Sequence, residues 1–131
     1  MAETARKPIR VLVVDDEVKF CRIVAEFLQE RGYTVETAST GLDALQAIQR
    51  QRPDVALLDM VMPKGPAGLE LLELIRQLPN PPRVIMVTAS DAEQTAPLAL
   101  QRGASAYLCK PVNLDALARL IAGEDAGRAA A

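Results

Sequence analysis

Five short runs of apolar and β-branched residues alternate along the chain with segments in which apolar residues recur every three or four positions. Runs of the first kind are typical of buried strands, and the longer spacing is typical of amphipathic helices. The runs predict strands at residues 10–14, 34–37, 55–58, 84–87 and 106–109. A helical segment follows each of these strands, so strand and helix alternate five times.

Four of the helical segments have a clear apolar face. The faces consist of Phe20, Ile23, Val24, Phe27 and Leu28; Leu42, Leu45 and Ile48; Leu69, Leu72 and Ile75; and Leu114, Leu117, Leu120 and Ile121. Gly32 is placed to end the first helix and Pro79 to end the third. The remaining helix, around residues 94–102, contains Pro97. Proline removes a backbone hydrogen bond inside a helix, so we expect this helix to start late or to kink.

The strands are apolar on both faces, which favours a parallel sheet that helices cover on both sides. Right-handed crossovers then favour a doubly wound α/β fold. A chain of 131 residues, half of them hydrophobic, is long enough for one such domain. We expect the domain at residues 9–122, with flexible tails at 1–8 and 123–131.

Composition and charge exclude several classes of function. The net charge is −2 and the basic residues are scattered, so the sequence does not predict a surface that binds nucleic acid directly. Neither a signal peptide nor a membrane span is evident. Cys21 and Cys109 have no metal-type spacing, and we interpret them as small core residues of a reduced, cytoplasmic protein. Because the chain lacks histidine, it can form no Ser-His-Asp triad, no histidine-ligated zinc site and no phosphohistidine.

Polar residues gather where the predicted strands end. Asp15 and Asp16 follow the first strand, Asp59 the third, Thr88 the fourth and Lys110 the fifth. In a doubly wound sheet the binding site lies beyond the carboxyl ends of the strands. Three carboxylates there would repel one another unless a cation balanced them, and oxygen ligands suit Mg²⁺. The sequence therefore predicts a magnesium site, with Lys110 as an additional positive charge.

Each of these residues, taken alone, also has an ordinary structural interpretation. Asp16 fits the N-cap of the first helix, and Asp59 fits a turn. Thr88 is a common residue at a strand end, and Lys110 could protect an edge strand from aggregation. Only their joint placement at matching strand ends favours a functional site.

Four motifs on these strand ends, VVDDE, LLDMVMP, VTAS and YLCKP, resemble the receiver domain of bacterial two-component response regulators. The resemblance covers residues 9–122. It implies a flavodoxin-like fold, in which five parallel strands in the order 2-1-3-4-5 are flanked by five helices. Hydrophobic periodicity alone does not supply that order.

The resemblance also implies roles for the acidic residues. Asp59 matches the phosphoryl acceptor, and Asp15 and Asp16 match the acid pair that holds Mg²⁺ together with Asp59. Val61 would contribute its backbone carbonyl to the metal, so its apolar side chain is no objection.

The remaining matches concern the response to phosphorylation. Thr88 would give its hydroxyl to the phosphoryl group, and Lys110 would pair with a phosphoryl oxygen. Tyr107 matches the aromatic residue whose burial reports the switch. The peptide bond between Lys110 and Pro111 is expected to be cis.

The implied function is that of a phosphorylation-activated response regulator in two-component phosphorelay signal transduction. Such a domain phosphorylates and dephosphorylates itself and is not a turnover enzyme. Since the chain lacks histidine, the donor would be a sensor histidine kinase, a histidine phosphotransfer protein or a small phosphoryl compound. A downstream effector would bind the face formed by the fourth helix, the fifth strand and the fifth helix. Few charges lie on the fifth helix, so we expect a monomer.

Two alternatives remain open at this stage. One is a receiver-like scaffold that binds partners without being phosphorylated. The other is a small aspartate-dependent phosphatase with its nucleophile on the first strand, for which Asp15 and Glu17 have a suitable spacing but which leaves Asp59 unexplained. The chain also departs from the family pattern in two places: the segment KGPAG after the acceptor motif, and Pro97 in the fourth helix.

Overall fold

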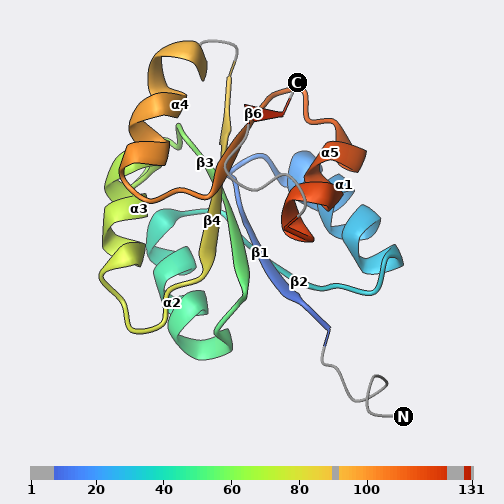
Figure 1. Cartoon of the computed structure of the whole chain (residues 1–131). Helices are drawn as coiled ribbons and strands as arrows, with labels where there is room; N and C mark the ends of the chain where they lie inside the picture. The colour runs from blue at the N-terminus through green and yellow to red at the C-terminus, as the bar shows by residue number, and fades with distance from the viewer. Residues whose placement is uncertain (1–7, 90–91, 124–128, 131) are drawn as a thin grey trace.

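The computed structural model describes residues 8–89, 92–123 and 129–130. It forms one sheet of parallel strands in the order β2-β1-β3-β4-β5-β6 (Figure 1). The strands are β1 (Arg10–Val14), β2 (Thr34–Ala38), β3 (Val55–Asp59), β4 (Arg83–Thr88), β5 (Ala106–Cys109) and β6 (Ala129–Ala130). The helices are α1 (Val18–Glu30), α2 (Gly41–Gln51), α3 (Gly68–Arg76), α4 (Ala92–Gln101) and α5 (Leu114–Ile121). The predicted doubly wound fold and its strand order are confirmed.

The helices cover the sheet as two layers. α2, α3 and α4 lie on one side of the sheet, and α1 and α5 lie on the other (Figure 1). Side chains alternate between the two cores along each strand, as the period of two requires. On β1, Leu12 and Val14 belong to the first core, while Val11 and Val13 belong to the second. Both faces of β1, β3 and β4 are therefore buried, which explains their continuous apolar runs, whereas β2 is partly exposed.

Two residues assigned to apolar helix faces are exposed instead. Ile23 on α1 is 57% exposed and Leu42 on α2 is 59% exposed, so these two assignments are wrong. The buried stripe of α1 consists of Cys21, Val24 and Leu28. Successive helical residues are about 100° apart, so Ile23 points away from that stripe.

The fourth helix begins earlier than expected. It starts at Ala92, and Pro97 lies inside it. A proline here cannot donate the hydrogen bond that its position in the helix requires. Ala96 and Ala99 of this helix are both fully buried, so the segment around Pro97 packs closely against the rest of the protein. The late start that Pro97 suggested is therefore wrong.

A short sixth strand lies near the C-terminus. β6 is a strand of two residues that the sequence did not predict, and it pairs with β5. The remainder of the predicted tails, residues 1–7, 124–128 and 131, lies outside the described residues. None of the helices in the described part of the chain has the length and apolarity needed to cross a membrane.

Candidate functional site

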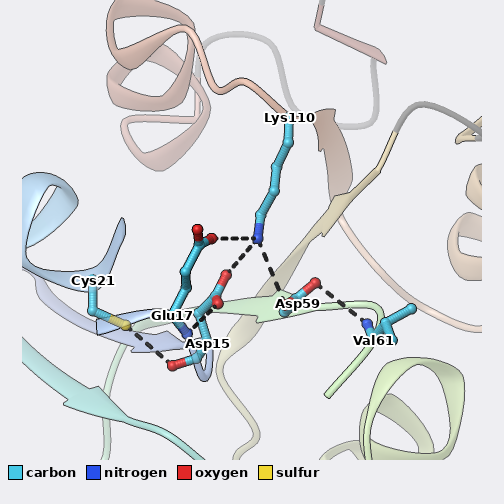
Figure 2. A network of polar contacts seen from close by, with 6 residues as sticks. All are labelled: Asp15, Glu17, Cys21, Asp59, Val61 and Lys110. Carbon is cyan, nitrogen blue, oxygen red and sulfur yellow. Dashed lines mark hydrogen bonds and ion pairs between the residues drawn. The ribbon is translucent and has the colours of Figure 1, made fainter. Parts of the chain in front are cut away.

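The polar residues predicted from the strand ends meet at one edge of the sheet. β1 and β3 are adjacent, with Val14 opposite Leu58, so Asp15 and Asp59 emerge side by side. β4 lies next to β3, and β5 lies next to β4 with Thr88 opposite Cys109. Lys110 follows β5 and extends back across the strand ends toward both acids (Figure 2).

Asp15 is the most constrained acid of the site. It is 2% exposed, its Oδ2 lies 2.9 Å from the Lys110 Nζ, and its Oδ1 accepts a hydrogen bond from the Glu17 amide at 2.9 Å (Figure 2). Both oxygens are therefore already engaged with protein donors. Such partners offset the cost of burying a carboxylate.

Asp59 is also buried but is held less tightly. Its Oδ1 accepts a hydrogen bond from the Val61 amide at 3.3 Å, and its Oδ2 lies 3.6 Å from the Lys110 Nζ. Burial and the neighbouring charge of Asp15 raise the pKa of Asp59 above its ordinary value of 3.8, against the opposing effects of the Val61 amide and Lys110. The ionised form of Asp59 is thus disfavoured unless more positive charge is supplied.

Lys110 is the cation that these acids share. Besides its contacts with Asp15 and Asp59, its Nζ lies 3.6 Å from the Glu17 Oε1 and 4.7 Å from the centre of the Phe20 ring. Burial alone would lower the pKa of the Lys110 ammonium, but the hydrogen bond to Asp15 and the three carboxylate charges together raise it above its ordinary value. Lys110 is therefore firmly protonated. The peptide bond from Lys110 to Pro111 is cis.

The acids are arranged so that one cation could contact all of them. One carboxylate oxygen from each of Asp15, Asp16 and Asp59 lies within 4.8 Å of the others. Asp16 is exposed, and it does not cap α1, because the N-cap is Glu17 and makes no side-chain cap hydrogen bond. Three carboxylates near one ammonium leave an excess of negative charge in a partly buried site. This donor set fits a hard cation such as Mg²⁺, which prefers oxygen ligands and retains water on its open side.

Thr88 and Tyr107, which the sequence also assigned to the site, contact other groups in this conformation. The Thr88 side chain is buried, and its hydroxyl donates to the carbonyl of Ala89 at 3.0 Å. Tyr107 is half-buried and packs against the core on the α2-α3-α4 side of the sheet. Val61 is adjacent to the acids through its amide, while its side chain is 75% exposed.

Three neighbours of the site were not predicted to belong to it. Glu17 pairs with Lys110, Phe20 places its ring under the same ammonium, and the Cys21 thiol donates to the Asp15 carbonyl at 3.3 Å. Burial and the charge of Asp15 raise the pKa of Cys21 to about 11, which disfavours the nucleophilic thiolate. In the sequence, Glu17 stood out only in the run DDE and as the second acid of the phosphatase alternative, and Phe20 was interpreted as a core residue.

The unusual segment KGPAG lies against the helix that follows β2. A Cβ on Gly41, the first residue of α2, would come within 2.0 Å of the Pro66 carbonyl oxygen. Gly68 has φ = +57°, and a Cβ there would come within 2.6 Å of the Met60 carbonyl oxygen. Glycine is therefore needed at both positions for the backbone beside Asp59 to pack this closely.

Asp59→Asn should stabilise the fold in metal-free buffer at pH 7, by about 1 kcal/mol. An amide keeps an acceptor for the Val61 N–H but removes the charge that burial and Asp15 disfavour. The pKa of Asp59 is higher in the folded state than in the unfolded state. The charge of Asp59 therefore destabilises the unmodified protein fully at pH values above the folded-state pKa, and not at all below the unfolded-state pKa. The stability gain measured by chemical denaturation should therefore grow as the pH rises from about 4 to 7.

Asp54→Asn is the matched control for this comparison. Asp54 precedes the opposite end of β3 and is exposed, and it accepts a hydrogen bond from the Arg10 amide. Its substitution removes the same charge without relieving any repulsion at the site. An equal gain in both variants would contradict charge repulsion as the cause.

Comparison with known proteins gives the family of the chain. Residues 11–122 match the family described as response regulator receiver domain. The chain is 37% identical over 110 residues to the probable transcriptional regulatory protein TcrX of Mycobacterium tuberculosis, covering 83% of this chain and 46% of that protein. It is 40% identical over 117 residues to the alginate biosynthesis transcriptional regulatory protein AlgB of Pseudomonas aeruginosa, covering 89% of this chain and 26% of that protein. The chain thus spans less than half the length of these relatives.

Solved structures agree with this assignment. The signal receiver domain of a putative LuxO repressor protein from Vibrio parahaemolyticus superposes with a TM-score of 0.82 at 32% identity, covering 91% of this chain and 90% of that one. A CheY-like response regulator receiver domain protein from Methanospirillum hungatei gives a TM-score of 0.82 at 33% identity, covering 90% and 94%. The chain therefore belongs to the receiver domain family of the response regulators of two-component systems.

Proposed function

We propose that this receiver domain accepts a phosphoryl group on Asp59 in a reaction that requires Mg²⁺. The observation that supports this most directly is that the Asp59 carboxylate lies beside those of Asp15 and Asp16 and 3.6 Å from the Lys110 ammonium. We propose a sensor histidine kinase or a histidine phosphotransfer protein as the physiological donor, because the chain itself has no histidine.

Phosphoryl transfer needs positioning and charge neutralisation more than covalent help from the protein. Asp59 attacks the phosphorus, a new O–P bond forms, and the P–N bond to the donor imidazole breaks, with the leaving nitrogen protonated from solvent. The Val61 amide holds Oδ1 of Asp59, which leaves Oδ2 directed toward Lys110. Lys110 offsets charge on the phosphoryl oxygens, and Asp15 and Asp16 would hold Mg²⁺, which supplies the remaining positive charge.

The contacts of Asp15 argue against the alternative of an aspartate-dependent phosphatase. Carboxylate oxygens that accept short hydrogen bonds are poorer nucleophiles. Here the Glu17 amide and Lys110 each contact one oxygen of Asp15 at 2.9 Å. Asp59, with one oxygen held only by a 3.6 Å ion pair, is the better nucleophile of the two.

The test uses phosphoramidate, a small donor that contains a P–N bond. The protein is incubated with phosphoramidate and Mg²⁺, and intact mass spectrometry follows incorporation. We expect one phosphoryl group per chain, mapped by peptide analysis to the segment that contains Asp59, and none when a chelator removes Mg²⁺. Absence of incorporation in the presence of Mg²⁺ would instead favour a scaffold that binds partners without phosphorylation.

We further propose that phosphorylation is read out through Thr88 and Tyr107. The Thr88 hydroxyl now donates to the Ala89 carbonyl, an ordinary hydrogen bond that contributes about 1 kcal/mol. A phosphoryl group offers charged acceptor oxygens, and hydrogen bonds to charged groups are stronger. Thr88 would therefore turn toward Asp59, and the space that it leaves would admit Tyr107. The face formed by α4, β5 and α5 would change, and we propose that an effector binds there.

Thr88→Ala should uncouple the acceptor from this face. With beryllofluoride and Mg²⁺ standing in for the phosphoryl group, NMR shifts in the unmodified protein should extend from Asp59 to α4 and Tyr107. The variant keeps Asp59, Lys110 and the acid pair, so it should still bind beryllofluoride, but shifts at Tyr107 should fall severalfold. Shifts confined to the acid site in the unmodified protein would contradict the switch.

A further inference from the structure

β5 would be an edge strand in a sheet of five, with half of its backbone groups unpaired. The Ser105 amide donates to the Val84 carbonyl at 2.8 Å, so the backbone of Ser105 faces β4. Backbone groups of successive residues in a strand point in opposite directions, and Tyr107 therefore also faces β4. The N–H and C=O groups of Ala106 and Leu108 point to the other side, toward the open edge.

β6 lies at this edge. Ala129 is aligned with Tyr107 and Ala130 with Leu108, in parallel orientation. In a parallel ladder with this register, Ala129 directs its own N–H and C=O toward Ala106 and Leu108, and Ala130 directs them away. Figure 1 shows β6 in dark red beside the sheet. Residues Ala129–Ala130, which follow α5 in the chain, thus form an additional parallel strand next to β5.

The β5 edge runs between two helices that pack on opposite faces of the sheet. Leu108 shares a core with Ala116 and Leu117 of α5, and Tyr107 packs in the other core together with Ala99 of α4. The open edge is consequently the middle of the α4-β5-α5 face. Any protein that binds this face meets β6 before it meets the backbone of β5.

We propose that the segment at Ala129–Ala130 is an intramolecular cover of the β5 edge, which a binding partner must displace to use the α4-β5-α5 face. The idea that a partner competes for this edge rests on the proposed function, whereas the pairing of β6 with β5 does not. Two residues of pairing give weak binding, but the covalent tether supplies a high effective concentration. The cover therefore closes the edge in the free protein and still yields to a partner that adds a longer strand.

Two single substitutions in the full chain test the pairing. Ala129→Pro removes the N–H that faces β5, whereas Ala130→Pro removes one that faces away. Hydrogen exchange by NMR should show the Leu108 amide exchanging roughly three- to tenfold faster in Ala129→Pro, and little changed in Ala130→Pro. The Tyr107 amide, which faces β4, is the reference in every sample and should not change. Equal exchange at Leu108 in all three proteins would overturn the proposal.

A peptide of sequence GRAAA, taken from residues 127–131, tests whether the edge is an exchangeable binding site. Added in trans, it should perturb Ala106 and Leu108 in Ala129→Pro at a severalfold lower concentration than in the unmodified chain, where the cover competes. Equal binding to the two proteins, or binding to neither, would overturn the proposal. No step uses phosphorylation or Mg²⁺, so failure here leaves the proposed function of Asp59 untouched.

Discussion

Asp59→Asn should abolish phosphoryl incorporation from phosphoramidate completely, the largest effect that we expect of any single substitution. An amide oxygen is a far weaker nucleophile than a carboxylate, and Asp59 is the buried acid that Lys110 holds more loosely, at 3.6 Å against 2.9 Å for Asp15. The substitution is nearly isosteric and keeps an acceptor for the Val61 amide. The fold should therefore survive, and intact mass spectrometry should show only the unmodified protein.

Asp54→Asn is again the control, because it removes the same charge at the other end of β3. It should incorporate phosphoryl at the rate of the unmodified protein. Incorporation that persists in Asp59→Asn would move the acceptor to another residue. Asp15 would then be the first to consider, since it lies in the same cluster.

Asp16→Ala should weaken Mg²⁺ binding by about ten- to hundredfold, a loss of roughly 1.4 to 2.7 kcal/mol. One oxygen from each of the Asp15, Asp16 and Asp59 carboxylates lies within 4.8 Å of the others. An ion that loses one of three charged ligands is balanced by less negative charge and binds more weakly. Asp16 is exposed, so the substitution should not disturb the core. Isothermal titration calorimetry with MgCl₂ measures the change.

Glu17→Gln separates direct ligation from a general effect of charge. Glu17 is the next residue, it pairs with Lys110 at 3.6 Å, and it lies outside the three-carboxylate group. Its substitution should alter the Mg²⁺ affinity by no more than about threefold. If the two variants lose affinity equally, Asp16 acts through its charge alone and does not ligate the ion.

The sequence determined most of the fold because the relevant signals are local. Most strands are apolar runs, β2 is rich in β-branched residues, and the helices repeat their apolar residues every three or four positions, so the elements follow from their own residues. The bounds of β1 and β5 match their predicted residues, and β2, β3 and β4 are longer by one or two residues. The carboxyl ends of parallel strands share one edge, and this rule alone predicts that Asp15, Asp59 and Lys110 lie together.

Tertiary structure decided the features that depend on residues far apart in the sequence. Lys110 and Asp15 are 95 positions apart, and only their 2.9 Å contact shows which acid the lysine prefers. Ile23 and Leu42 fit an apolar face by spacing, but their exposure depends on which helix side the sheet covers. The strand order came from the family resemblance, because the residues of a strand do not name the strands it pairs with. β6 carries no hydrophobic pattern at all: its pairing uses backbone groups that every residue has, so the sequence held no signal for it.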